Sequence, residues 1–158
     1  MSFDSQQFRR ALGRFATGVC VITAEPPGHA PFGVTVNSFS SLSLTPPLVL
    51  WSLQKNSDTM DAFAVATHYC VNVLTEEQQA LSGRFARKGE HALDASDYSS
   101  GDAGLPVLNG VLASFECEID ARHDGGDHII LVGKVVAMRA GEPGRPLLYF
   151  DGGYRQIG

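Results

Sequence analysis

Short apolar runs and regular alternation of apolar and polar residues dominate this sequence. The alternation is clearest in residues 111–122, where Phe115 and Cys117 face one way and Ser114 and Glu116 face the other. A period of two residues is typical of a β-strand. The other strand-like runs, bounded by glycine, proline or polar residues, are a hairpin within residues 16–39 and strands at 47–53, 68–74, 128–139 and 145–150.

Three segments have the three- and four-residue spacing of helices instead. In residues 4–15 this spacing relates Phe8, Leu12 and Phe15, and a polar residue at the start can cap the first turn. The two other helices, each with a capping residue at its start, are expected at 56–66 and 75–86.

The order of these elements predicts the fold class. Consecutive strands joined by short turns favour antiparallel pairing, and long apolar strands with few helices to cover them must close on themselves. We therefore expect a mainly β protein, a small barrel with peripheral helices, in one domain over residues 1–158. Residues 87–110 are polar and rich in glycine, and predict a long loop of the kind that is functional or disordered. Neither GxGxxG nor a P-loop is present, so a doubly wound nucleotide fold has no support.

Composition and charge exclude several classes of partner. The formal net charge is −5 and no window is strongly basic, which argues against nucleic acid or an anionic membrane surface. No apolar run approaches the roughly 20 residues that a membrane-spanning helix needs. The amino-terminal residues lack the apolar core of a secretory signal. Cys20, Cys70 and Cys117 lie far apart in strand-like runs, and we expect buried thiols in a reducing cytoplasm.

The stretch FGVTVNSFSSLSL, residues 32–44, combines apolar neighbours with many small hydrogen-bonding side chains. One interpretation is a turn between two strands, because Asn and Ser often bond to nearby backbone. The other is the edge of a binding site for a planar heterocycle, whose rim needs neutral donors and acceptors and whose faces need apolar cover. The pattern alone leaves both open.

The stretch HDGGDH, residues 123–128, raises a similar choice. Two histidines and two aspartates suggest a metal site. Ligands on either side of a two-glycine hairpin usually point along divergent strands, however, so a polar hairpin turn is the favoured interpretation. The sequence predicts no metal site.

Six segments then resemble, in order, the short-chain flavin reductases. They are FRRALGRFATGVCVITA, GVTVNSFSSLSLTPPLVLWSL, LSGRFA, PVLNGVLASFECEI, GDHIILVGKVV and LLYFDGGYR, and together they cover nearly the whole chain. Members of that family are NAD(P)H:flavin oxidoreductases with an FMN-binding split barrel. The resemblance therefore implies an antiparallel split β-barrel with peripheral α-helices.

The resemblance also implies the site. Thr35, Asn37 and Ser38 would hydrogen-bond the flavin ring, and His128 would contact the nicotinamide as the catalytic-site residue. Residues carried over to the ribityl chain, the phosphate and the ring face are Ser40, Ser41, Ser52, Asn56, Ser57, Thr59, Arg84, Phe85 and Tyr154.

The implied reaction is hydride transfer from NADH or NADPH to FMN or FAD, with reduced flavin passed to a flavin-dependent monooxygenase. The resemblance further implies a homodimer with the flavin sites near the interface. A non-catalytic flavin-binding protein on the same barrel is the alternative. The sequence distinguishes neither FMN from FAD nor NADH from NADPH.

Overall fold

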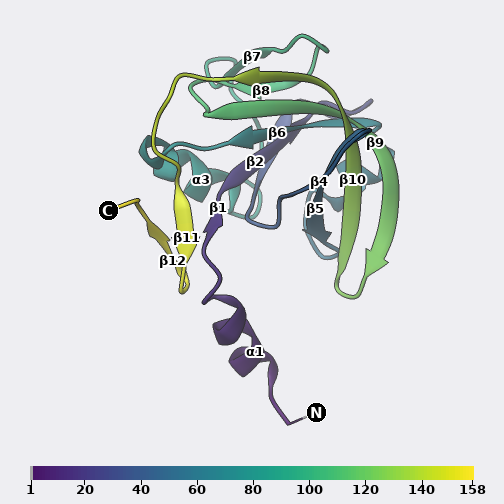
Figure 1. Cartoon of the computed structure of the whole chain (residues 1–158). Helices are drawn as coiled ribbons and strands as arrows, with labels where there is room; N and C mark the ends of the chain where they lie inside the picture. Colours follow the sequence, from purple (N-terminus) through teal and green to yellow (C-terminus); the bar gives the residue numbers. More distant parts are fainter. Residues whose placement is uncertain (1) are drawn as a thin grey trace.

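The computed structural model describes residues 2–158 and is mainly β, as the sequence predicts (Figure 1). Seven strands form an antiparallel sheet in the order β3-β2-β6-β9-β10-β5-β4. Their bounds are β2 Cys20–Ala24, β3 Phe32–Val36, β4 Ser40–Leu44, β5 Pro47–Gln54, β6 His68–Val73, β9 Ala113–Gly125 and β10 His128–Ala140. A second sheet joins β1 (Thr17–Gly18), β11 (Leu148–Phe150) and β12 (Gly153–Arg155), and a two-stranded sheet joins β7 (Tyr98–Ser100) and β8 (Pro106–Leu108).

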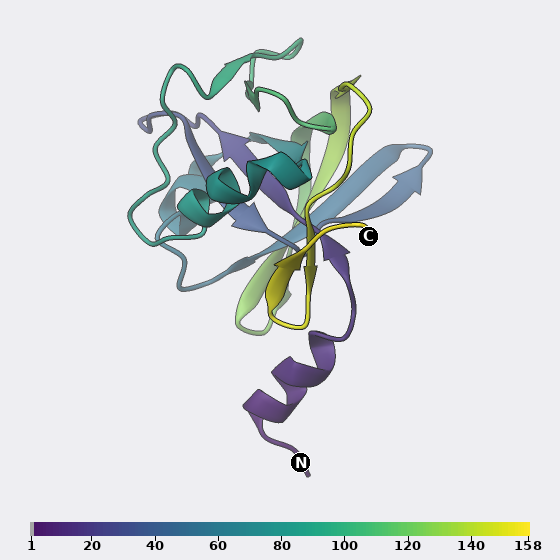
Figure 2. The ribbon, with the colours of Figure 1, turned by 90° about the vertical axis from the view of Figure 1, so that its left-hand side faces the viewer.

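The helices are short and lie outside the large sheet (Figures 1 and 2). They are α1 (Ser5–Leu12), α2 (Met60–Val65) and α3 (Gln79–Phe85), with a 3₁₀ turn η1 (Glu76–Gln78) before α3. All three predicted helices are confirmed within a few residues. No helix within residues 2–158 is both long and apolar enough to cross a membrane.

The two edges of the large sheet are close together, because consecutive strands form them. β3 and β4 lie at opposite ends of the strand order, yet only residues 37–39 connect them. That connection spans no more than about 14 Å, so the sheet must curl. No ladder pairs β3 with β4 among the described strands, so the sheet is curled but not closed.

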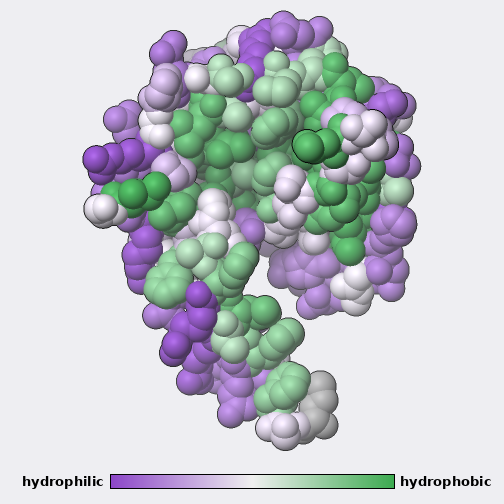
Figure 3. Space-filling model, viewed as in Figure 1, coloured by the Kyte–Doolittle hydropathy of each residue, from purple (hydrophilic) through white to green (hydrophobic). Residues whose placement is uncertain are grey.

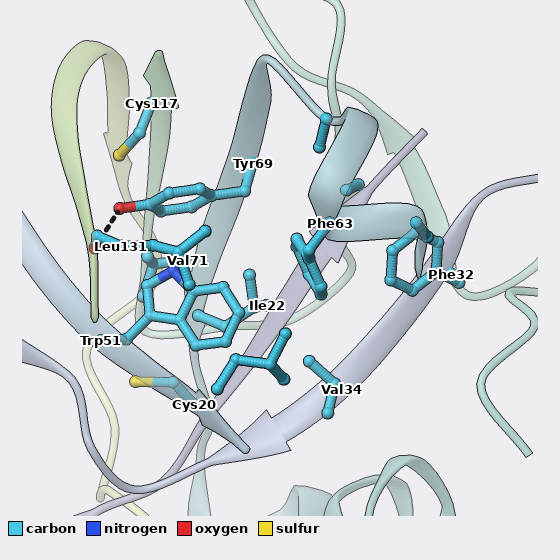
Figure 4. Close-up of a cluster of buried hydrophobic side chains, with 14 of the residues drawn as sticks. Cys20, Ile22, Phe32, Val34, Trp51, Phe63, Tyr69, Val71, Cys117 and Leu131 are labelled. Atoms are coloured by element: carbon cyan, nitrogen blue, oxygen red, sulfur yellow. Dashed lines mark hydrogen bonds between the residues drawn. The ribbon is translucent and has the colours of Figure 1, made fainter. Parts of the chain in front are cut away.

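The concave side of the sheet holds an aromatic core (Figure 4). Trp51 packs edge-on against Phe63 and Tyr69, with ring centroids 5.0 and 5.6 Å apart, and all three are fully buried. The three cysteines are buried and free, as expected, and burial raises the pKa of Cys20 to about 12. Trp51 thus anchors β5 to this core directly before Ser52 and Leu53, which border the site described below.

The opposite side of the sheet is covered as well, which the alternation in β9 does not reveal. Ser114 and Glu116 are 3% and 2% exposed. The Glu116 carboxylate accepts hydrogen bonds from the backbone N–H groups of Ala103 and Leu105, at 3.0 and 3.1 Å. The expectation of one long loop over 87–110 was therefore wrong in part, because β7, β8 and the turn between them lie in this range and cover this face.

Helix α1 stands apart from the rest of the chain (Figures 1 and 2). Asp4 and Gln7 form a capping box at its start, but none of its residues is buried. Phe8, Leu12 and the following Phe15 are 53%, 57% and 77% exposed. Hydrophobic residues gather along one side of this projecting helix (Figure 3).

Candidate functional site

A cavity of about 410 Å³ opens where β3, β5 and the end of α3 meet. Its volume is in the range typical of small-molecule sites. Buried Phe85 and the aliphatic side chains of Val34, Val36 and Leu53 supply apolar surface. The polar lining consists of Thr35, Asn37, Ser38, Ser52, Gln54, Asn56, Ser57, Asp58, Lys88 and His91.

Ser38 fastens the bend after β3 to the neighbouring strand. Its hydroxyl donates to the carbonyl oxygen of Ser52 (3.1 Å) and accepts from the backbone N–H of the same residue (3.0 Å). A serine hydroxyl has one donor and two acceptor positions. One acceptor position therefore remains for a ligand, and the bend is fixed without any charged group.

The side-chain amide of Asn37 makes no hydrogen bond to another part of residues 2–158, although Asn37 lines the cavity. Asn56, which follows β5, also lines the cavity, and its side-chain amide has no hydrogen-bond partner within residues 2–158. Each amide offers two donors and an acceptor. The cavity thus presents uncommitted neutral hydrogen-bonding groups beside apolar surface.

A second cavity of about 270 Å³ adjoins the first and shares Thr35, Val36, Asn37 and Ala86 with it. Tyr149 and Tyr154 form its far wall, with their rings at 5.6 Å in an edge-to-face arrangement.

Helix α3 holds this wall in place. The Tyr154 and Ser82 hydroxyls are 2.6 Å apart, and the Thr35 hydroxyl donates to the carbonyl oxygen of Ser82 at 2.7 Å. Tyr154 therefore lies beside the larger cavity rather than in it.

Three ionisable groups, Asp58, Lys88 and His91, line the larger cavity. His91 Nε2 lies 2.8 Å from the Asp58 carboxylate. Lys88 is exposed and forms no ion pair within residues 2–158. An ammonium in a polar cavity without a carboxylate partner is suited to binding an anion.

Arg84 is committed elsewhere. Its guanidinium bonds to the Asp97 carboxylate at 2.9 and 3.3 Å and to the carbonyl oxygen of Ala92 at 2.8 Å. The Asp97 hydrogen bond raises the pKa of Arg84. Burial would raise the pKa of Asp97, but the Arg84 and Asp94 hydrogen bonds and the Arg84 charge lower it overall. Arg84 fixes the segment after α3 and does not line either cavity.

The structure brings together most of the residues that the sequence analysis assigned to the site. The larger cavity is lined by Thr35, Asn37, Ser38, Ser52, Asn56, Ser57 and Phe85, and the smaller one by Tyr154. Ser40 and Ser41 lie instead on the exposed edge strand β4, outside both linings. Thr59 is buried behind Ser57, with the two hydroxyls 2.8 Å apart.

His128 lies at the start of β10, next to the cavity but not in its lining. It pairs with Gln54 of β5, a lining residue. Its Nδ1 is 2.7 Å from the Asp127 carboxylate, and this hydrogen bond lowers the pKa of Asp127. The polar hairpin turn that the sequence predicts in this stretch is confirmed, with Gly126 and Asp127 as its two loop residues and Gly126 at φ +76°. No cluster of three potential metal ligands occurs within residues 2–158.

Sequence reasoning did not identify Gln54, Asp58 or His91 as site residues. Asp58 stands between the assigned Ser57 and Thr59, so its neighbours carried a signal. His91 lies in a polar loop, where only loop length hinted at function. The spatial pairing of Asp58 with His91 follows from the fold and has no local sequence pattern.

A family model described as "Flavin reductase like domain" matches residues 12–158. Among curated proteins, the NADH-dependent FMN reductase SmoA of Agrobacterium fabrum is 51% identical over 152 residues, covering 95% of this chain and 84% of that protein. The reductase subunit HsaB of a flavin-dependent monooxygenase from Rhodococcus jostii is 39% identical, covering 99% of this chain and 80% of that protein.

Solved structures give the same result. The Streptomyces globisporus NADH:FAD oxidoreductase SgcE6, solved in complex with NAD and FAD fragments, matches with a TM-score of 0.91 at 34% identity. The match covers 98% of this chain and 93% of that chain.

Proposed function

Because this chain belongs to the flavin reductase-like domain family, we propose that it is an NAD(P)H-dependent flavin reductase. It transfers a hydride from reduced nicotinamide to FMN or FAD. The relative at 51% identity is an NADH-dependent FMN reductase, which favours NADH as donor. Residues 1–158 act as a single flavin reductase-like domain.

The chemistry of the larger cavity carries this proposal. A flavin has a flat apolar ring with neutral polar edges and a tail that ends in phosphate. The cavity offers a buried aromatic and aliphatic wall, uncommitted amides at Asn37 and Asn56, and one unpaired ammonium at Lys88. The residues present therefore fit the group.

We assign the ring edge to Thr35, Asn37 and Ser38, and the ribityl chain and phosphate to Ser52, Asn56 and Ser57 with Lys88. Tyr154 borders the ring from the smaller cavity. We assign no flavin contact to Ser40, Ser41, Thr59 or Arg84, because they lie outside both linings. The hydroxyl of Thr59 and the guanidinium of Arg84 are bonded to Ser57 and Asp97 respectively.

A bound flavin supplies the electron-accepting chemistry, so the protein need not provide an acid–base pair. The chain's own part is positioning. Ser38 and Ser52 fix the bend that carries Asn37, and the Thr35–Ser82 bond holds β3 against α3. Fixed donors at the polar rim stabilise negative charge that grows there during reduction, without reorganisation.

His128 is proposed to contact the nicotinamide side of the site. Its strand partner Gln54 lies in the cavity wall, so a group at position 128 is one strand away from the flavin. That placement allows it to act on the hydride donor and to leave flavin binding alone.

We further propose that the curled sheet is a split barrel and that the chain forms a homodimer. An isolated helix as short as α1 is marginal in water, and its apolar side chains Phe8 and Leu12 remain more than half exposed. A second copy would bury them. Sedimentation of the wild type and of a Phe8→Ser, Leu12→Ser variant tests this; an active, flavin-saturated wild-type monomer contradicts it.

The partner that consumes reduced flavin is proposed to be a flavin-dependent monooxygenase, because a relative covering 99% of this chain is the reductase subunit of one. Three free buried thiols support a reducing compartment, the cytoplasm.

A steady-state assay of NADH and NADPH oxidation with FMN, FAD and riboflavin tests the proposed activity. Flavin-dependent oxidation supports it and identifies the preferred pair. Tight flavin binding without turnover would favour the non-catalytic alternative.

A further inference from the structure

His91 closes one corner of the larger cavity, and each of its ring nitrogens lies within hydrogen-bond distance of an oxygen. Nδ1 lies 2.8 Å from the carbonyl oxygen of Gly33, and Nε2 lies 2.8 Å from the Asp58 carboxylate. A carbonyl oxygen and an ionised carboxylate can only accept. Making both hydrogen bonds at once therefore requires a proton on each ring nitrogen, which is the imidazolium form of His91.

The Asp58 carboxylate is ionised for reasons that the geometry makes clear. Burial alone would raise the pKa of Asp58, but hydrogen bonds from Gly89 and His91 and the charge of His91 lower it overall. The second carboxylate oxygen accepts from the backbone N–H of Gly89 at 2.7 Å. Asp58 thus holds two points of the segment that follows α3.

This segment carries Lys88. Gly89, at φ +80°, turns the chain directly after it, and the backbone N–H of Gly33 donates to the carbonyl oxygen of His91 at 2.8 Å. The stretch 89–91 is therefore fastened to β3 and to Asp58, and Lys88 immediately precedes it at the cavity wall.

The charges around His91 can be counted from the residues that line this corner. Lys88 and His91 are positive and Asp58 is negative, so the wall has a surplus of one positive charge while His91 is protonated and none when it is neutral. On the same segment, Arg87 pairs with Glu90 at 3.4 Å. Strand β3 contributes only the backbone of Gly33, and the guanidinium of α3 is tied to Asp97.

We infer that Asp58 and His91 form a pH-dependent latch that positions Lys88 for the phosphate of a bound flavin. The inference rests on the proposed function. When His91 is neutral, one of its two hydrogen bonds is lost, and the Asp58 charge offsets that of Lys88 instead of that of His91. Both changes weaken the binding of an anion, so phosphate affinity falls as pH rises.

The Asp58→Asn variant distinguishes the effect of the Asp58 charge from the purely structural effect of its hydrogen bonds. An asparagine side chain can accept from Gly89 N–H with its oxygen and donate to a neutral His91 with its amide. The geometry is kept, while the charge that depends on His91 is removed. Asp102→Asn is the matched control, because Asp102 pairs with Arg139 (2.7 Å) and neither residue lines this cavity.

The experiment measures dissociation constants of FMN and riboflavin by quenching of flavin fluorescence, from mildly acidic to mildly alkaline buffer. Ionisation of the FMN phosphate is common to all variants, so differences between their curves report the latch. As pH rises, the FMN affinity of wild type and of Asp102→Asn should fall roughly fivefold more than that of Asp58→Asn. A factor of this size is expected for one partly exposed charge interaction. Riboflavin, which lacks the phosphate, should give parallel curves for all three proteins.

Identical FMN curves for wild type and Asp58→Asn overturn the inference, and so does the same pH dependence for riboflavin. If Asp58→Asn does not fold, His91→Gln replaces it, because glutamine is neutral at every pH. This variant must then show the smaller loss of FMN affinity with rising pH. Failure of every protein to bind either flavin refutes the proposed function itself, and the inference with it.

Discussion

Two walls of the same cavity are built by different physical means. One wall, here called the neutral wall, consists of β5 and the bend after β3. It is held by hydrogen bonds between uncharged groups, the two between the Ser38 hydroxyl and the backbone of Ser52. The opposite wall, here called the charged wall, is the segment after α3. It is held by the Asp58–His91 pair and by the hydrogen bond from the Gly89 backbone N–H to Asp58.

The difference separates two tasks. Neutral bonds keep their geometry over a wide range of pH, which suits the edge of a ring that must be held in register for hydride transfer. A wall built on ionised groups has strength that varies with pH, which suits a phosphate contact that can be weakened.

Removing the side chain between the two walls should damage both. Phe85 is fully buried and lines the cavity, so Phe85→Ala should lower the free energy of unfolding by about 3–5 kcal/mol. Denaturant titration measures it. Phe150→Ala, at a position that is 37% exposed, is the control and should cost clearly less. Equal losses in the two variants would contradict the placement of Phe85 in the core.

Asn37→Ala tests the neutral wall. If its amide bonds the flavin edge, removing it leaves a polar ligand group unpaired, at a cost of about 1–3 kcal/mol, or roughly ten- to a hundredfold in affinity. Flavin titration measures the loss, and circular dichroism should not change. A fall in stability with unchanged flavin affinity would show that Asn37 only forms the bend.

Lys88→Met tests the charged wall at a fixed pH. FMN affinity should fall by roughly fivefold, because one partly exposed charge contact to phosphate is lost, while riboflavin affinity should stay the same. Arg87→Met changes a neighbouring cation that pairs with Glu90 and does not line the cavity. Equal effects of the two variants on FMN binding would rule out a specific role for Lys88.

As pH falls, the charged wall should lose stability before the neutral wall does. The pKa values of Asp58 and Asp97 are lowered in the folded protein, so the stability that each adds is present above the ordinary aspartate pKa of about 3.9 and is lost as pH falls through the lower folded value. We expect each to contribute about 1 kcal/mol or less. Hydrogen exchange as a function of pH should show residues 86–97 opening before β5 does; simultaneous opening would contradict the distinction.

His128→Ala should have the smallest effect on flavin binding, because His128 belongs to neither wall. Flavin affinity should change by less than about 1 kcal/mol. The Michaelis constant for reduced nicotinamide should rise, or flavin reduction should slow. Stopped-flow kinetics across a range of NADH concentrations decides the matter, and unchanged reduction at every concentration would exclude the proposed nicotinamide contact.

The sequence predicts most of the fold because burial and alternation mark the inner strands. It misses β4, whose serines and leucines lie on a sheet edge with exposed side chains, so no periodic burial identifies it. It misses β7 and β8 because three-residue strands carry too short a pattern.

The neutral wall of the site could be predicted because Thr35, Asn37 and Ser38 lie within four residues of one another and match a segment of the flavin reductases; the polar pattern alone left a turn equally open. The charged wall could not, because Asp58 and His91 meet only through the tertiary fold. Arg84 illustrates the same limit, since its carboxylate partner Asp97 lies thirteen residues further along the chain.

The most direct test of the central claim is anaerobic mixing of the flavin-loaded protein with NADH, followed by flavin absorbance. The account predicts rapid bleaching that saturates with NADH concentration and far exceeds the rate for free flavin. Bound flavin that bleaches no faster than free flavin would contradict it, and would leave a flavin-binding protein without reductase activity.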